Sequence, residues 1–143
     1  MRMRIKPMTA NFIPPVYKTE GAAAFDIFLQ HDLTLTPHNP VTFGLGFGAG
    51  MDEGYSAELL PRSGVGRKYG VRLLNTIGLI DYDFDGEWAV TLDCDKPCSF
   101  KRGDRILQCV IRWAARATDI EVETNKRGLE SGSTGVCNMN GSR

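Results

Sequence analysis

The chain has 143 residues, 17 of them basic and 17 acidic, so its formal net charge at neutral pH is zero. A chain of this length predicts one domain, and its balanced charge argues against a general attraction to nucleic acid or to an anionic membrane surface. No apolar run approaches the ~20 residues that span a bilayer, so a bound polyanion would have to be held by locally clustered arginines.

The chain begins with a basic segment, Met1 to Pro7, that lacks the apolar stretch of a signal peptide. We therefore expect a cytoplasmic protein. The segments that follow are typical of a β protein, because short apolar runs alternate with turn-forming residues, and the chain has sixteen glycines and seven prolines. The runs that predict strands are Thr42 to Phe47, Tyr55 to Leu60, Val71 to Leu74, Trp88 to Leu92 and Ile106 to Trp113.

One short helix is expected, from Ser63 to Tyr69, and no segment keeps a helical apolar stripe beyond two turns. Many short strands separated by turns predict an all-β sandwich or jelly-roll barrel over residues 1–124. From Asn125 the composition changes to Gly, Ser, Thr and Asn. Such a segment cannot pack a core, so residues 125–143 are expected to form a mobile arm.

The four cysteines do not predict a disulfide framework, because a chain of this length does not need one and reduced thiols are typical of the cytosol. Cys94 and Cys98 have a three-residue spacer but no second pair, and His31 and His38 lie far away in the sequence. A zinc site is therefore not favoured, since it requires four ligands.

The segment from Leu60 to Glu87 carries the most informative pattern. Arg62-Ser63-Gly64 offers a cation, a hydroxyl and an unshielded backbone, which suit phosphate oxygens. Taken alone, this triplet is also typical of a turn. Further along, Asn75 precedes Asp81 by six residues, and the aromatic Phe84 follows three residues later. An amide can read the edge of a base, a carboxylate can activate water, and a ring can cover a sugar.

The order and spacing of these residues resemble the second and third motifs of the trimeric deoxyuridine triphosphatases (dUTPases). Pro15 to Thr19 followed by Gly21 to Ile27 is similar to the first motif, and Gly103 to Gln108 to the fourth. Arg127 to Gly135 is similar to the fifth, in the C-terminal arm. The resemblance implies a dUTPase-like β jelly roll that forms a homotrimer with shared active sites. It also implies hydrolysis of dUTP to dUMP and pyrophosphate, which limits uracil in DNA and supplies dUMP for dTMP synthesis.

The resemblance also implies a role for each matching residue. Asp81 would act as the base for the attacking water, and Gln108 would bond near the α-phosphate. Asp26 would support Mg²⁺ through water, although its local sequence fits a turn carboxylate equally well. The residues that would bind substrate are Arg62, Ser63, Gly64, Asn75, Gly78, Ile80, Phe84, Arg127, Gly132, Ser133 and Thr134.

Two departures from the family pattern concern the nucleoside. Phe84 stands where the family usually has tyrosine, so the ring is retained and the phenol oxygen is lost. Ser131 stands where an aromatic residue that covers uracil is expected, and the fifth motif is one residue shorter than usual. The cover of the base, and with it the tolerance of a substituent at carbon 5, is the feature that the pattern leaves open.

Three alternative hypotheses follow from the same residues. Asp81, Asp83, Asp85 and Gly86 match the opening of a calcium loop, but that loop needs a glutamate where Leu92 stands and also needs flanking helices. The related dCTP deaminases would have their deaminating glutamate at Thr91, so deamination is disfavoured and cleavage of another or a 5-modified pyrimidine triphosphate is the nearer rival. A dUTPase-fold regulator that acts through a protein partner leaves no recognisable mark in one sequence.

Overall fold

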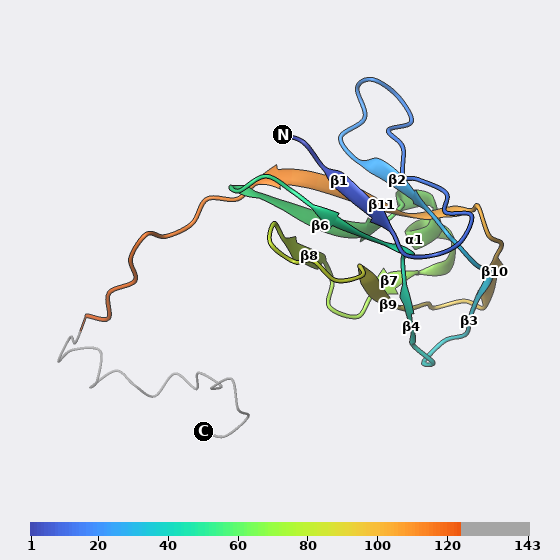
Figure 1. Cartoon of the computed structure of the whole chain (residues 1–143). Coiled ribbons are helices and arrows are strands. Elements are labelled where there is room, and N and C mark those ends of the chain that lie inside the picture. Colours follow the sequence, from blue (N-terminus) through green and yellow to red (C-terminus); the bar gives the residue numbers. More distant parts are fainter. Residues whose placement is uncertain (124–143) are drawn as a thin grey trace, which may run out of the picture.

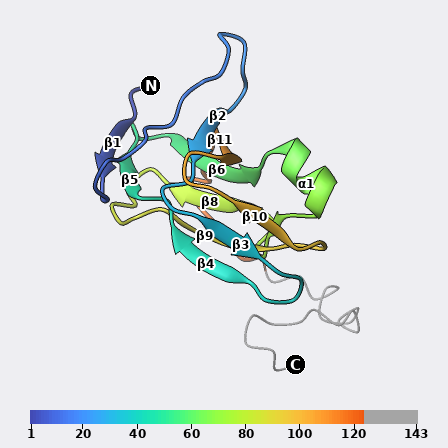
Figure 2. The same cartoon turned by 90° about the vertical axis from the view of Figure 1, so that its right-hand side faces the viewer.

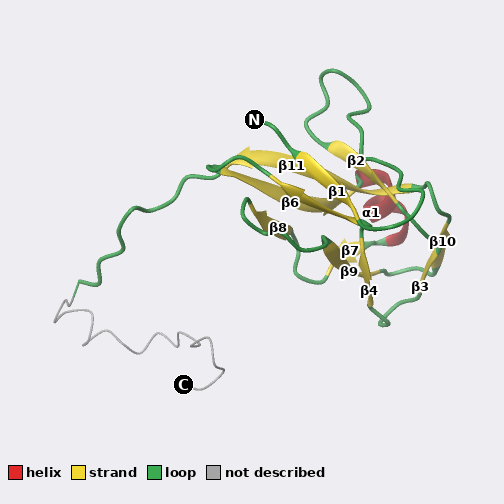
Figure 3. Ribbon diagram, in the orientation of Figure 1, coloured by secondary structure: helices red, strands yellow, loops and turns green. Residues whose placement is uncertain are grey.

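The computed structural model describes residues 1–123, which form strands, loops and one short helix (Figure 3). The elements are β1 (Arg4–Pro7), β2 (Phe25–Phe28), β3 (Leu33–Leu35), β4 (Val41–Gly44), β5 (Phe47–Gly50), β6 (Tyr55–Pro61), α1 (Ser63–Tyr69), β7 (Arg72–Leu73), β8 (Gly78–Asp81), β9 (Ala89–Asp93), β10 (Cys98–Phe100) and β11 (Arg105–Trp113). The all-β class predicted from the sequence is confirmed.

The strands pair in antiparallel fashion in two main sheets, one with the order β2-β11-β6-β8 and one with the order β4-β9-β7. Two further pairs, β1 with β5 and β10 with β3, extend the layers. Figure 2 shows the first sheet lying over the second, with α1 protruding at one end. This arrangement is a distorted jelly-roll barrel, in which a sheet edge is covered or turned rather than left long and open.

The core lies between the two layers and contains large apolar side chains with no exposed surface, among them Trp88, Phe47 and Leu92. On β6, Ala57 and Leu59 are fully buried while their neighbours are half-buried, which is the period-2 alternation of a strand with one face on the core. The thiols of Cys94, Cys98 and Cys109 are free and buried in this core. These three cysteines form no disulfide bond with one another.

Helix α1 has the bounds that the sequence predicted, from Ser63 to Tyr69. It ends at Gly70, which has φ of +67° and donates its N–H to the carbonyl oxygen of Gly66. A left-handed residue with such a bond is the usual helix terminator, and glycine adopts this conformation without a steric penalty.

The single strand expected from Thr42 to Phe47 is wrong. The chain forms β4 and β5 instead, and they are separated at Leu45 and Gly46, where Gly46 has φ of +80°. A left-handed glycine turns the chain so that β4 pairs with β9 while β5 pairs with β1. Five further strands, which are only three or four residues long, were not predicted from the sequence: β1, β2, β3, β8 and β10.

The described part of the chain after β11, residues 114–123, extends away from the barrel (Figure 1). The arm expected over residues 125–143 lies outside the described residues. Within residues 1–123, no helix is long and apolar enough to cross a membrane.

Candidate active site

One cleft brings together the residues predicted from the first, second and fourth motifs. Asp26, Arg62, Ser63, Gly64 and Gln108 line a cavity of about 700 Å³. Strands β2, β11 and β6 are adjacent, so their registers set Asp26 opposite Gln108 and Gln108 opposite Leu60, two residues before Arg62. Sheet pairing therefore assembles in space a group that is spread over more than eighty residues of sequence.

Asp26 lies on β2 rather than in a turn, and it is only 6% exposed. Nη1 of Arg105 donates a hydrogen bond to Oδ2 of Asp26 at 3.0 Å, and Nε of Arg62 lies 3.4 Å from Oδ1. Nη1 of Arg62 also donates to the backbone oxygen of Arg105 at 3.0 Å. A buried carboxylate needs such partners, and the network fixes the Arg62 guanidinium at the edge of the cleft.

The other cleft residues present polar groups on a rigid frame. The amide nitrogen of Gln108 donates to the carbonyl oxygen of Pro61 at 3.0 Å, which fixes the orientation of this side chain beside Arg62. Ser63 and Gly64 are exposed in the first turn of α1. A Cβ atom built on Gly64 would meet no heavy atom within 4 Å, so the glycine leaves its backbone open to an approaching ligand.

The residues predicted to read the base lie on a different part of the molecule. Asn75 is exposed in the turn that links β7 of one sheet to β8 of the other, and Gly78 begins β8. Both residues line a cleft of about 310 Å³ that also includes the hydroxyls of Thr42 and Thr91, which are 2.8 Å apart. Ile80, the third residue of β8, is half-buried.

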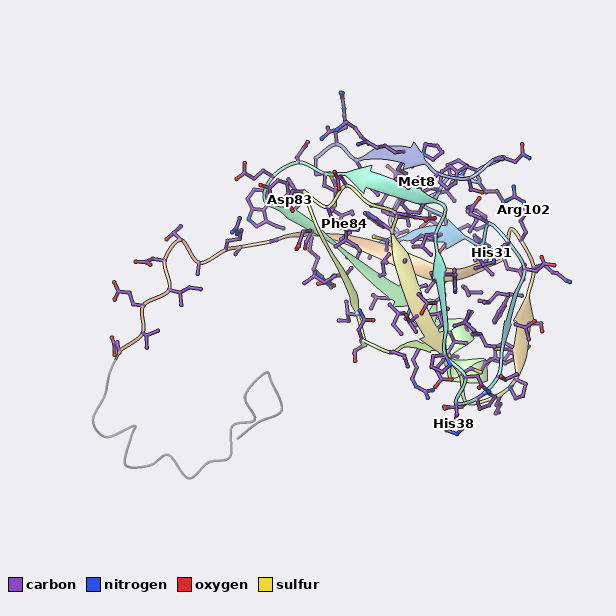
Figure 4. The ribbon with its side chains drawn as sticks, turned by 60° about the horizontal axis from the view of Figure 1, so that its bottom comes forward. Met8, His31, His38, Asp83, Phe84 and Arg102 are labelled. Carbon is purple, nitrogen blue, oxygen red and sulfur yellow. The ribbon has the colours of Figure 1, made fainter. Side chains whose placement is uncertain are left out.

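Asp81 is exposed at the end of β8 and lines a cleft of about 420 Å³ with Tyr55 and Asp83. Phe84 is 43% exposed, and the edge of its ring lies so close to Gly86 that a Cβ atom there would be 2.8 Å from Cζ of the ring. Figure 4 shows Asp83 and Phe84 at the end of the barrel from which residues 114–123 leave. Strands β8 and β9 flank this turn, whereas a calcium loop would lie between helices.

Asp81 and the first cleft, which contains Arg62 and is also called the Arg62 cleft, are far apart within one copy of the chain. Across the sheet, Asp26 on β2 lies opposite Gln108 on β11, and Gln108 lies opposite Leu60 on β6. Asp81 on β8 lies opposite Ser56, which precedes Leu60 by four residues on β6. Three strand spacings and a four-residue offset correspond to about 14 Å across the sheet and about 13 Å along it, or roughly 20 Å in all. One copy therefore does not bring Asp81 into contact with a group bound at Arg62.

Residues predicted from the fifth motif, Arg127, Gly132, Ser133 and Thr134, lie outside the described residues, as does Ser131. Three cations at or behind the first cleft were not predicted from the sequence. Arg105 holds Asp26, while Lys18 and Lys68 line the cavity itself. Lys18 belongs to the first-motif segment and Lys68 to α1, so their positive charge within motif segments was the available signal.

The side chains of the first cleft fit a magnesium ion that is bound mainly by the phosphate oxygens of a ligand in the cleft. Residues 1–123 contain no group of three or more His, Cys, Asp or Glu side chains arranged to hold a metal ion. Asp26 is the one carboxylate among the described residues that line the cleft, and both its oxygens already contact arginine. Mg²⁺ usually retains several waters and binds through one or two carboxylates together with phosphates, so Asp26 could contribute through water.

Comparison with known proteins gives a consistent result over nearly the whole chain. The dUTPase family profile matches residues 10–138. The deoxyuridine 5'-triphosphate nucleotidohydrolase of Nautilia profundicola is 36% identical over 141 residues, which cover 94% of this chain and 99% of that protein. The corresponding protein of Beijerinckia indica is 42% identical over 131 residues, covering 85% of this chain and 82% of that protein.

Solved structures of similar fold include two from staphylococcal phages. A mutant dUTPase of phage phi11, described with a structural Mg(II) ion, has a TM-score of 0.78 at 18% identity and covers 87% of this chain and 98% of its own. A mutant dUTPase of phage 80alpha, with dUpNHpp, has a TM-score of 0.75 at 20% identity and the same coverage. These structures share the jelly-roll fold described above.

Proposed function

Because the chain belongs to the dUTPase family, we propose that it hydrolyses dUTP to dUMP and pyrophosphate at sites shared between copies of the chain. In a cell this reaction would limit uracil incorporation into DNA and supply dUMP for dTMP synthesis. The observation that carries the proposal is the cleft in which a fixed arginine, a hydroxyl, an open glycine backbone and a glutamine converge.

The first cleft would bind the phosphates. Arg62 can donate two N–H groups to phosphate oxygens, and guanidinium pairs well with phosphate. Its orientation is maintained by Asp26 and by the backbone of Arg105, so little rotational freedom would be lost on binding. Ser63 would add a hydroxyl donor, and Gly64 would let an oxygen approach the backbone. Gln108 would hydrogen-bond near the α-phosphate.

The turn between β7 and β8 would bind the nucleoside. The Asn75 side chain carries a donor and an acceptor, which match the alternating groups on the edge of uracil. Gly78 and Ile80 would provide backbone and apolar contacts beside it. The Phe84 ring would lie against deoxyribose, where a 2′-hydroxyl would collide with it. Arg127, Gly132, Ser133 and Thr134 of the arm would close over the β- and γ-phosphates.

Asp81 would orient the attacking water and accept its proton, which requires a distance within hydrogen-bond reach. The separation of roughly 20 Å between Asp81 and Asp26 within one copy supports a site in which a second copy supplies Asp81. Exposed apolar side chains in the same region, such as Leu79 at 64% and Trp113 at 71%, are also consistent with an interface there. We propose a homotrimer, since cyclic symmetry would create three equivalent shared sites.

A bound Mg²⁺ would neutralise charge on the triphosphate and fix its conformation. Asp26 would contact the ion through water and keep Arg62 in position at the same time. Proton transfer, by contrast, would depend on Asp81 alone, because Asp26, the one carboxylate among the described residues that line the first cleft, is buried and paired with two arginines.

A specific observation favours a second candidate, the hydrolysis of pyrimidine triphosphates with a polar substituent. The hydroxyls of Thr42 and Thr91 lie in the same cleft as Asn75, and each can donate or accept a hydrogen bond. Thr91 carries no carboxylate, so this cleft offers no group for deamination at that position.

Pyrophosphate release from dUTP, UTP, dCTP, dTTP and 5-hydroxymethyl-dUTP with Mg²⁺ tests both candidates. We expect dUTP to be preferred over UTP and dCTP by at least tenfold in kcat/KM. A rate with 5-hydroxymethyl-dUTP equal to or above that with dUTP would favour the second candidate. Release from none of the five would contradict the proposed activity.

A further inference from the structure

The first cleft contains more positive charge than the resemblance assigns to it. Among its described lining residues, Arg62, Lys18 and Lys68 are cationic and Asp26 is anionic. The charge of Arg62 is already partly neutralised, because its Nε lies 3.4 Å from Oδ1 of Asp26. A nucleoside triphosphate carries about four negative charges near neutral pH, since the terminal phosphate has a second pKa near 6. A bound Mg²⁺ would offset two of these charges, and Arg62, which is already paired with Asp26, would leave part of the remainder unmatched.

Lys18 and Lys68 approach the cleft from two different segments. Lys18 lies in the loop before β2, and Lys68 lies in the last turn of α1. Within residues 1–123, neither ammonium group has a carboxylate within 4.0 Å, in contrast to Lys101 and Arg72. The Lys68 ammonium lies 5.2 Å from the centre of the Tyr69 ring, which holds its side chain beside the cleft.

A purely local role does not account for this placement. A cation in the last turn of a helix stabilises the helix carbonyl end, and both Arg67 and Lys68 stand in the last turn of α1. Lys68 lines the cleft and Arg67 does not. The pair Arg67 and Lys68 therefore separates the effect of helix charge from an effect on a ligand.

We propose that Lys18 and Lys68 bind the phosphate chain of the substrate and set a preference for nucleoside triphosphate over diphosphate and monophosphate. This inference rests on the proposed function and names two further substrate-binding residues for it. The Coulomb attraction of each ammonium grows with the number of phosphate charges in the cleft. The two lysines should therefore discriminate by phosphate number and contribute little to recognition of the base.

Calorimetric titration of the full chain with dUMP, dUDP and a non-hydrolysable α,β-imido analogue of dUTP, each with Mg²⁺, tests this inference. The variants are Lys18→Met, Lys68→Met and the double substitution, because methionine keeps the apolar stem and removes the charge. Arg67→Met is the matched control. We expect each single variant to bind the triphosphate analogue about fivefold more weakly, and the double variant about twentyfold, with less than about twofold change for dUMP.

Replacement by arginine, Lys18→Arg and Lys68→Arg, should retain most of the affinity, because the charge remains. An equal loss for dUMP, dUDP and the triphosphate would show a structural effect and overturn the inference, as would unchanged affinities or a similar loss in Arg67→Met. A wild-type chain that binds none of the three nucleotides would contradict the proposed function, and this inference with it.

Discussion

Gly64→Ala separates the stability of α1 from the approach of phosphate to its backbone. Gly64 lies inside the helix, and a Cβ atom there would meet no heavy atom within 4 Å. Replacing a helical glycine by alanine gains up to about 1 kcal/mol of helix propensity. The same methyl group would stand in the cleft, in the path of a phosphate oxygen. The substitution should therefore stabilise the protein and impair its activity.

The expected magnitudes are distinct for the two effects. A gain of about 1 kcal/mol corresponds to an increase of about 3 °C in Tm for a chain of this size. Displacement of the phosphates by about 1 Å lowers the rate on the order of a hundredfold. Gly66→Ala is the matched control, because Gly66 lies in the same helix, its Cβ would have only an ordinary contact at 3.6 Å, and it does not line the cleft.

Thermal unfolding at one fixed chain concentration, combined with pyrophosphate release, measures both effects. Both variants should unfold at a higher temperature, and only Gly64→Ala should lose activity. A wild-type kcat/KM in Gly64→Ala would refute close approach of phosphate at this residue. An equal loss in Gly66→Ala would attribute the effect to the helix as a whole.

Four further outcomes follow from the described residues. Asp81→Asn should bind dUTP normally but turn over at least about a hundredfold more slowly; near-normal kcat would remove Asp81 from the role of base. Asp26→Asn replaces the charge-assisted hydrogen bond from Arg105 by a neutral one, so urea unfolding should show a loss of about 2 kcal/mol, and unchanged stability would contradict the structural role of the network. Burial raises the pKa of the Cys98 thiol to about 11 and that of the Cys109 thiol to about 12, from an ordinary value of 9.0. Because the thiolate is the reactive form, iodoacetamide at pH 8 should modify these two residues only after unfolding, and mass spectrometry would detect the modification. Because these pKa values are raised in the folded state, the thiols favour folding below about pH 9, and stability should fall as pH rises above that value.

The sequence predicted the short helix, several of the strands, and five of the thirteen residues that line the first cleft. The bounds of α1 could be predicted because the stop at Gly70 and the preceding residues are local signals. The strand from Thr42 to Phe47 was wrong because the backbone conformation of Gly46 depends on its tertiary neighbours, including the N–H of Met8, which bonds to its carbonyl oxygen. Strands as short as β8 gave too few residues for an alternation to be recognised.

The positions of the candidate site residues in space could be predicted less well than their identity. Arg62 and Asp81 are nineteen positions apart in the sequence, but β8 pairs with the far end of β6 and carries Asp81 away from the cleft. Strand register depends on contacts between distant segments, and no local spacing encodes it. The ion pairs of Asp26 with Arg62 and Arg105 follow from the same pairing and left no signal in the sequence.

Subunit complementation tests most directly whether dUTP is hydrolysed at sites built from two copies. Arg62→Ala and Asp81→Asn chains should each be nearly inactive alone. After co-refolding in equal amounts, about one site in four should combine an intact Arg62 cleft with an intact Asp81, so about a quarter of wild-type activity should return. Mixed assemblies, verified by native mass spectrometry, that remain as inactive as the separate variants would contradict a shared site.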